Sequence, residues 1–305
     1  MGAKYNQPLV VICGPTASGK SAIALELAQL KSGEIICADS RTIYKGMDIG
    51  TAKPTKEEQA QIPHHLVDVV EPGERFTVYD FQQHAKDSIK KIRENGHLPI
   101  LVGGTGLYID SVIFDYTFPS QKEQHNSFTQ LSLIELQEYC MKNNISLPEN
   151  YKNKRYIINT ILRNNENGKK RSHPVENTII VGITTNKEEL IERITSRTEH
   201  MFECGVVEEA KKLGGIYGWE HEAMTGNIYP LLKRYLDGTM TREEVLRQFI
   251  MLDWRLAKRQ ITWLKRNSFI HWISREDALP FLLKLLHNAI DSPKLNKNAI
   301  IIGDD

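Results

Sequence analysis

A glycine-rich loop near the N-terminus constrains the fold of this chain more than any other segment. Residues Gly14–Ser21 form a complete Gly-x-x-x-x-Gly-Lys-Ser motif. The apolar run Leu9–Cys13 directly before it is typical of a buried strand, and Ala22–Leu30 follows with helical apolar spacing. A strand that turns through glycines into a helix directs backbone N–H groups and the helix dipole at one point. The motif therefore predicts a site for a diphosphate or a triphosphate.

The loop identifies the anion but not the reaction. Lys20 supplies a mobile positive charge, and the hydroxyl of Ser21 can ligate Mg²⁺. Kinases, nucleotide hydrolases and some transferases all use such a loop, so ATP binding is compatible with it. The alternative, a glycine-rich turn followed by a chance Lys-Ser pair, is disfavoured by the strand and helix on either side.

Strand-like apolar runs alternate with helical patterns through most of the chain. The runs cover 9–13, 34–38, 66–70, 99–102, 178–183 and 269–273. Helical patterns cover 20–31, 78–94, 106–113, 187–202, 206–213, 229–236, 241–265 and 276–290. This alternation predicts an α/β fold with a parallel sheet flanked by helices, whose ligands bind beyond the carboxyl ends of the strands.

The composition changes in the middle of the chain. Between Tyr116 and Pro174, Asn, Gln, Lys and Ser become frequent, and only 131–141 and 155–162 have helical patterns. We expect a small helical insertion domain over 117–175, a discontinuous core formed by 1–116 and 176–290, and a C-terminal tail over 291–305. Seven basic residues and one acidic residue lie between Tyr151 and Val175. This basic patch suits nucleic-acid phosphates, although a solvated loop explains it equally well.

The composition bears on which partners, metal sites and cellular locations are compatible with this chain. Lys and Arg number 39 against 38 for Asp and Glu, so a polyanion would have to bind a local patch. The four cysteines have no spacing typical of zinc sites or disulfides, and Cys13 and Cys37 lie in apolar runs that suit the core. We expect a structural role for the adjacent His64 and His65, because no third metal ligand has suitable spacing. No apolar stretch suits export or membrane insertion, and we expect a cytoplasmic protein.

A carboxylate follows the second predicted strand. Asp39 comes directly after the run 34–38, at the same sheet edge as the phosphate loop. It could bind Mg²⁺ or remove a proton from a nucleophile that faces the phosphate-bearing ligand. Asp39-Ser40 is also well suited to cap a turn or a helix, which is the alternative interpretation.

A second glycine turn ends the run 99–102. The segment Gly103–Tyr108 repeats the strand–glycine–helix arrangement of the first loop without its lysine. Thr105 could donate to a ligand or cap the helix that follows. The glycines could equally make only a tight turn.

A basic helix face lies within the stretch Trp254–Arg266. The residues that share it by i, i+3/i+4 spacing are Arg255, Arg259, Thr262 and Arg266. A solvated basic face is the usual explanation for such a run. The interleaved Trp254 and Trp263 raise contact with a polyanion or a nucleotide as the alternative.

Taken together, these motifs resemble the tRNA dimethylallyltransferases, also called tRNA isopentenyltransferases. The resembling segments stand in the family's order and are Gly14–Ser21, Asp39–Pro54, Pro63–Leu66, Gly103–Tyr108 and Leu256–Leu264. The phosphate loop is generic, whereas Asp39–Pro54 is highly specific. The resemblance implies the fold of P-loop kinases without movement of a phosphoryl group. The implied reaction transfers a dimethylallyl group from dimethylallyl diphosphate to the N6 amine of the adenosine 3′-adjacent to the anticodon, in tRNAs reading codons that begin with U.

The resemblance also implies roles for individual residues. Asp39 would be the catalytic base that accepts a proton from the attacking amine, while Thr16 and Lys20 hold diphosphate oxygens. The implied diphosphate-binding residues are Gly14, Pro15, Thr16, Ala17, Ser18, Gly19, Lys20, Ser21 and Arg259. The implied tRNA contacts are Asp39, Ser40, Arg41, Thr42, Thr105, Arg155, Lys169, Lys170, Arg171 and Lys258. Ser21 would bind Mg²⁺, and the substrates would be dimethylallyl diphosphate and a tRNA anticodon stem-loop, bound by a monomer.

Two segments depart from the family's pattern. Family members usually carry two arginines three residues apart in the insertion, whereas Lys154–Ile161 keeps only Arg155. Where the family tends to have Gly-Tyr followed by Lys or Arg, this chain has Ala223–Pro230 with no basic residue. These departures suggest a non-catalytic RNA-binding protein as one alternative. A small-molecule or nucleoside kinase, which the phosphate loop and the position of Asp39 alone would support, is the other.

Overall fold

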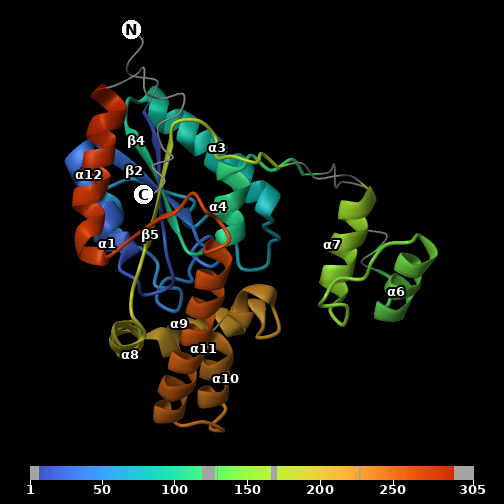
Figure 1. Ribbon diagram of the computed structural model, residues 1–305. Helices are drawn as coiled ribbons and strands as arrows, with labels where there is room; N and C mark the ends of the chain where they lie inside the picture. The colour runs from blue at the N-terminus through green and yellow to red at the C-terminus, as the bar shows by residue number, and fades with distance from the viewer. Residues whose placement is uncertain (1–6, 119–127, 129, 166–169, 227, 292–305) are drawn as a thin grey trace. The chain divides into compact units, whose positions relative to one another are not determined.

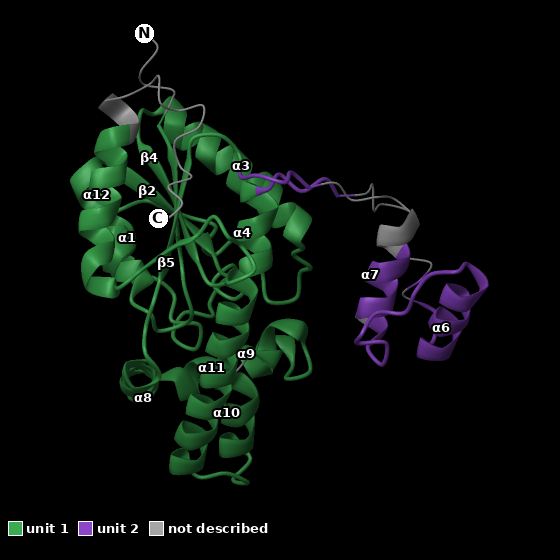
Figure 2. Cartoon of the chain, in the orientation of Figure 1, with its two compact units in different colours: residues 1–113, 175–305 green, residues 114–174 purple. Residues whose placement is uncertain are grey.

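The structure, a computed structural model, describes residues 7–118, 128, 130–165, 170–226 and 228–291 of the chain (Figure 1). The chain divides into two compact units (Figure 2). Unit 1 consists of Met1–Ile113 and Val175–Asp305, and unit 2 consists of Phe114–Pro174. The sequence predicted an insertion over 117–175. Lys169 and all of the predicted tail except Asp291 lie outside the described residues.

Unit 1 is built on a six-stranded sheet with the order β3-β2-β4-β1-β5-β6, in which all pairings are parallel. The strands are β1 (Leu9–Cys13), β2 (Gly33–Ala38), β3 (His64–His65), β4 (Leu98–Gly103), β5 (Thr178–Ile183) and β6 (His271–Ile273). Every residue of β1, β2, β4 and β5 is buried, as expected for parallel strands covered by helices on both faces. The predicted α/β fold class is confirmed.

Helices cover both faces of the sheet. Helices α1 (Lys20–Lys31) and α12 (Arg275–Asp291) lie on one face, and α3 (Val78–Glu94) and α4 (Gly106–Ile113) lie on the other (Figure 1). On the first face, the buried side chains of β1, β2, β4 and β5 pack against α1 and α12 in one apolar cluster. The sequence predicted the bounds of α1, α3 and α4 correctly, because each begins directly after a glycine turn or a capping threonine.

A helical layer gathers beyond the phosphate loop, below the sheet in Figure 1. It consists of α8 (Lys187–Glu203), α9 (Val206–Tyr217), the short 3₁₀ helix η1 (Glu222–Thr225), α10 (Tyr229–Leu236) and α11 (Arg242–Leu264). Its apolar core includes the buried Met47, Tyr229 and Phe249. The segment after β2 is thereby packed against helices from the C-terminal half of the chain.

The predicted strand over 66–70 is wrong. The strand β3 contains only His64 and His65, because Leu66 (φ 62°) and Asp68 (φ 55°) adopt left-handed backbone conformations that end the extended run. A helix that the sequence did not predict, α2 (Lys56–Gln61), precedes β3 and begins with a capping box between Thr55 and Glu58.

His65 has a carboxylate partner at the edge of the sheet. Its Nε2 lies 2.6 Å from Oε2 of Glu34, and Nδ1 of His97 lies 2.6 Å from the other oxygen. The Glu34 side chain is buried, so the two histidines satisfy a carboxylate that would otherwise lack partners. The contact gives His65 a role in the packing of β2 and β3.

The described part of unit 2 contains the helices α6 (Leu133–Lys142) and α7 (Lys154–Asn165). They enclose a small core that includes Leu136, Cys140 and Ile161. Both helices were predicted, and their observed bounds differ from the predicted ones by up to three residues. Among the described helices of the whole chain, none has the length and apolar composition needed to cross a membrane.

Candidate active site

The phosphate loop leaves the N-terminus of α1 free of side-chain caps. Gly19 is the cap residue, with φ 87°, and makes no capping hydrogen bond through a side chain. Ala17 is also left-handed, with φ 60°, so the backbone curls around the loop. A Cβ atom at Gly14 would lie 2.8 Å from Oγ of Ser18, so a larger residue there would crowd the turn. The first N–H groups of α1 are thereby available to an anion.

Lys20 lies at the centre of the charges around this loop. Its Nζ donates to the Pro15 carbonyl at 3.1 Å. Burial lowers the pKa of Lys20 to about 8, while the Asp39 carboxylate raises it and the Arg197 guanidinium lowers it further. Both Asp39 and Arg197 therefore act electrostatically on the ammonium group.

Two cavities meet around Lys20. The side chains that line both are Thr16, Lys20, Asp39, Thr51, Ala52 and Arg197. The first, called the Thr105 cavity, has a volume of about 240 Å³ and is also lined by Ser40, Arg41, Thr105, Tyr229 and Arg259. The second, called the Ser21 cavity, has a volume of about 350 Å³ and is also lined by Ala17, Gly19, Ser21, Thr42, His64 and Arg193. Asp39 thus lies where the two cavities meet, together with Thr16 and Lys20 of the phosphate loop.

A hydrogen bond connects the turn after β2 with the second glycine turn, which follows β4. The backbone N–H of Ser40 donates to Oγ1 of Thr105 at 3.2 Å, and that of Arg41 donates to Oδ1 of Asp39 at 2.8 Å. Asp39 therefore caps its own turn and lines both cavities, so the two interpretations of this residue are compatible. Thr105 links the ends of β2 and β4 at the same place.

Other predicted site residues lie elsewhere or have no described side chain. Gly14, Pro15 and Ser18 line neither cavity, and Ser18 is buried behind the loop. Lys258 is exposed on α11 and also lines neither cavity. In unit 2, Lys170 and Arg171 are exposed, while the side chain of Arg155 is not described.

Three polar residues that the sequence did not assign to the site lie beside the phosphate loop, on α8 and α11. Arg197 and Gln260 contact Thr16 of the loop, and Asp253 pairs with Arg197. Nη1 of Arg197 donates to Oγ1 of Thr16 at 2.8 Å, and its Nη2 forms an ion pair with the buried carboxylate of Asp253. Oε1 of Gln260 accepts the backbone N–H of Thr16 at 2.7 Å. The i, i+4 spacing of Arg193 and Arg197 was the available signal for Arg197, and Gln260 lies inside a resembling segment.

Trp263 packs against the second glycine turn. Its Nε1 donates to Oδ2 of Asp110 at 2.7 Å, and a Cβ atom at Gly106 would lie 2.1 Å from its indole ring. At Gly104, a Cβ atom would lie 2.5 Å from Nε2 of Gln260. These glycines permit the close approach of α11, so the tryptophan has a packing role in the described structure.

The chain is similar to several known proteins. The sequence matches the model of the IPP transferase family over residues 42–267. It is 38% identical over 288 residues to a tRNA dimethylallyltransferase of Anoxybacillus flavithermus, which covers 90% of this chain and 93% of that protein. It is 33% identical over 295 residues to the tRNA dimethylallyltransferase of Bacillus subtilis, with coverage of 91% and 94%.

Solved structures share the fold. The full-length tRNA isopentenylpyrophosphate transferase of Bacillus halodurans superimposes with a TM-score of 0.72 at 31% identity, covering 96% of this chain and 100% of that one. A eukaryotic dimethylallyltransferase that acts on tRNA superimposes with a TM-score of 0.73 at 21% identity, covering 94% and 80%.

Proposed function

This chain belongs to the IPP transferase family and is a tRNA dimethylallyltransferase, and from that premise we propose that the junction of the two cavities is its active site. The transferred group comes from dimethylallyl diphosphate, and the acceptor is the N6 amine of the adenosine 3′-adjacent to the anticodon, in tRNAs reading codons that begin with U. The observation that carries the proposal is that Thr16, Lys20, Asp39 and Arg197 line both cavities.

Each cavity suits one substrate. The Ser21 cavity contains the end of the phosphate loop and the start of α1, where backbone N–H groups and Lys20 can hold diphosphate oxygens. The Thr105 cavity contains Ser40, Arg41 and Thr105, which offer the hydrogen-bonding groups that a flipped adenine needs. A diphosphate in one cavity and a nucleoside in the other would face each other across Asp39.

The reaction is a displacement at the allylic carbon. The adenosine N6 lone pair forms the new C–N bond while the C–O bond to the diphosphate breaks, and the electron pair of that bond leaves with the diphosphate. Lys20, Arg197 and the loop N–H groups stabilise the negative charge that accumulates on the leaving group. Asp39 accepts the proton that the nitrogen loses, so neither ATP nor a redox cofactor is consumed.

We propose Mg²⁺ as the cofactor. The Ser21 hydroxyl and the Asp39 carboxylate both line the Ser21 cavity, and oxygen donors of this kind suit Mg²⁺. Among the described residues, no group of three His, Cys, Asp or Glu side chains is arranged to hold a metal ion. Mg²⁺ usually binds through one or two protein oxygens and substrate phosphates. The ion would add positive charge beside the leaving diphosphate.

Basic residues outside the cavities would hold the tRNA backbone. Arg255 and Lys258 are exposed on α11, Arg266 is exposed just beyond the end of that helix, and Lys170 and Arg171 are exposed in unit 2. Each phosphate that they neutralise releases counterions and strengthens binding. A protein that modifies tRNA in this way would work in the cytoplasm, as the sequence suggested.

Two parallel assays, each with a different labelled substrate, test the proposed function. We expect label from dimethylallyl diphosphate to enter unmodified tRNA in the presence of Mg²⁺, and label from the γ-phosphate of ATP to enter neither tRNA nor nucleosides. The reverse pattern would establish a kinase instead. A tRNA in which guanosine replaces the adenosine 3′ of the anticodon is the matched control, and labelling of that tRNA would contradict the proposed acceptor.

A further inference from the structure

The turn Asp48–Gly50 is held by a carboxylate from a distant helix. Oε2 of Glu209 on α9 accepts the backbone N–H groups of Asp48 and Ile49, both at 2.8 Å. Its Oε1 accepts the N–H of Gly50 at 2.9 Å and the hydroxyl of Tyr229 at 2.9 Å. One carboxylate thus satisfies three consecutive backbone donors and one side-chain donor, and charge-assisted bonds of this kind are stronger than neutral ones.

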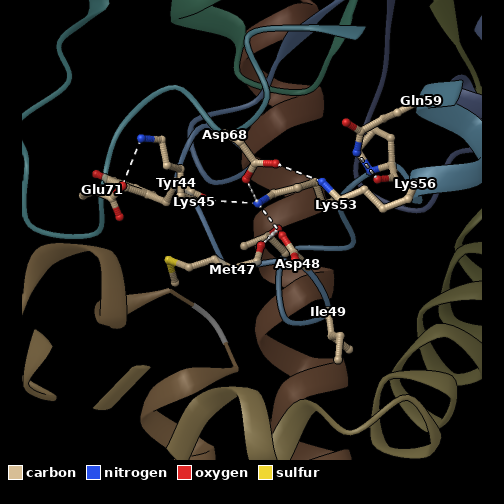
Figure 3. A network of polar contacts seen from close by, with 12 residues as sticks. Tyr44, Lys45, Met47, Asp48, Ile49, Lys53, Lys56, Gln59, Asp68 and Glu71 are labelled. Carbon is tan, nitrogen blue, oxygen red and sulfur yellow. Dashed lines mark hydrogen bonds and ion pairs between the residues drawn. The ribbon is translucent and has the colours of Figure 1, made fainter. Parts of the chain in front are cut away.

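The same segment is anchored at its other end by Lys53 (Figure 3). The Nζ of this buried lysine donates to the Tyr44 carbonyl at 2.8 Å. It also forms ion pairs of 2.6 Å with the carboxylates of Asp48 and Asp68. Because the buried ammonium has three partners in different parts of the segment, this anchor is expected to be rigid.

The residues between the two anchors form the common wall of the two cavities. Thr51 and Ala52 line both cavities, and Gly50 lines the Thr105 cavity beside Tyr229. A Cβ atom at Gly50 would lie 2.6 Å from the Tyr229 hydroxyl, so the turn is pressed against α10. Glu209 itself lines neither cavity. It can therefore affect the reaction only through the turn that it holds.

We propose that Glu209 is a positioning residue for prenyl transfer, which fixes the wall formed by Thr51 and Ala52 where the two substrates meet. Loss of the carboxylate frees three backbone donors and lets this wall shift. Displacement reactions are sensitive to misplacement of about 1 Å, which can lower the rate by about 10²-fold. The phosphate loop is a separate segment that Glu209 does not contact, so it retains its geometry. The inference rests on the active site proposed above.

The test compares transfer with diphosphate binding in Glu209 variants. We expect Glu209→Ala to lower kcat for transfer by about 10²-fold, whereas its affinity for inorganic diphosphate in the presence of Mg²⁺ changes less than about twofold. Glu209→Gln keeps one acceptor oxygen and the side-chain volume, and it should restore part of kcat. Glu208→Ala is the matched control, because Glu208 is the neighbour of Glu209 on α9 and lines neither cavity.

The outcomes separate positioning from a merely structural role. Loss of diphosphate binding in proportion to loss of kcat would mean that the variant unfolds or collapses the whole site, and would overturn the inference. A folded Glu209→Ala protein with unchanged kcat would also overturn it. If Glu209→Ala does not fold, Glu209→Gln decides by the same two measurements. Failure of the wild type and Glu208→Ala to transfer any label would instead reject the proposed function.

Discussion

The guanidinium of Arg197 reaches the hydroxyl of Thr16 across 181 residues of sequence, at 2.8 Å. Its other terminal nitrogen is paired with Asp253, a buried residue of α11. The buried acid orients the arginine, and the arginine presents its charge to the phosphate loop. A planar guanidinium can make both contacts at once because its donors are arranged in a fixed fork.

We expect Arg197→Lys to weaken transfer although it keeps the charge. A lysine has one ammonium group and cannot contact Thr16 and Asp253 in the same geometry. The predicted result is a fall in kcat/KM for dimethylallyl diphosphate of about 10²-fold, the lower end of the range for loss of one donor to a developing oxyanion. Steady-state kinetics at saturating tRNA measure it. Glu199→Ala, on the same helix, is the control, and a lysine variant with normal kcat/KM would remove Arg197 from leaving-group stabilisation.

Replacement of the proposed base should separate chemistry from binding. We expect Asp39→Asn to lower kcat by about 10²-fold to 10⁴-fold, as for removal of a positioned base. The asparagine can still accept the Arg41 N–H, so the turn that lines the Thr105 cavity is kept. Single-turnover transfer and tRNA binding by filter retention are the measurements. Near-normal turnover would show that another group accepts the proton, whereas equal losses in tRNA affinity and turnover would assign Asp39 to binding.

The sequence predicted those parts of the proposed site that follow from the order of strands and helices along the chain. In a parallel sheet, segments that follow neighbouring strands meet at one edge, so the alternation of strands and helices along the chain was enough to group Gly14–Ser21, Asp39 and Thr105. The helix bounds of α1, α3 and α4 were equally accessible, because each begins at a glycine turn or a capping residue.

The residues that the sequence could not place depend on packing between distant helices. Arg197 and Asp253 are 56 residues apart, and no local periodicity indicates that α8 and α11 lie side by side. The hold of Glu209 on Asp48–Gly50 likewise depends on how α9 packs against the segment after β2. The false strand over 66–70 has a different cause, since apolar composition does not reveal the left-handed backbone at Leu66 and Asp68.

The Glu34 carboxylate should make the stability of unit 1 depend on acidity. Burial by itself raises the pKa of Glu34, but hydrogen bonds from His97 and His65 outweigh it and hold the pKa below its ordinary value of 4.5. A carboxylate with a depressed pKa contributes stability above its unfolded pKa, and this contribution is lost as the pH falls through its folded pKa. We therefore expect Glu34→Gln to lower the free energy of unfolding at pH 7 by about 1–3 kcal/mol.

Chemical denaturation at several pH values checks this expectation. The difference in unfolding free energy between wild type and Glu34→Gln should shrink as the pH falls below the ordinary carboxyl pKa of 4.5. Glu26→Gln, at an exposed position on α1, should change the unfolding free energy by less than about 0.5 kcal/mol. A difference for Glu34→Gln that persists unchanged to pH 3 would mean that packing, and not ionisation, makes the contribution.

The basic residues of unit 2 should account for part of the salt dependence of tRNA binding. Lys170 and Arg171 are exposed, and each phosphate that they neutralise contributes about 0.7–0.9 to the slope of log K against log salt concentration. We expect the double replacement Lys170→Ala and Arg171→Ala to reduce that slope by about 1.5. The change of charge is matched by Lys211→Ala with Lys212→Ala, at exposed positions on α9. Equal slopes in the two double variants would show that the insertion acts only through overall charge, whereas a reduced slope confined to the first would establish direct phosphate contacts by unit 2.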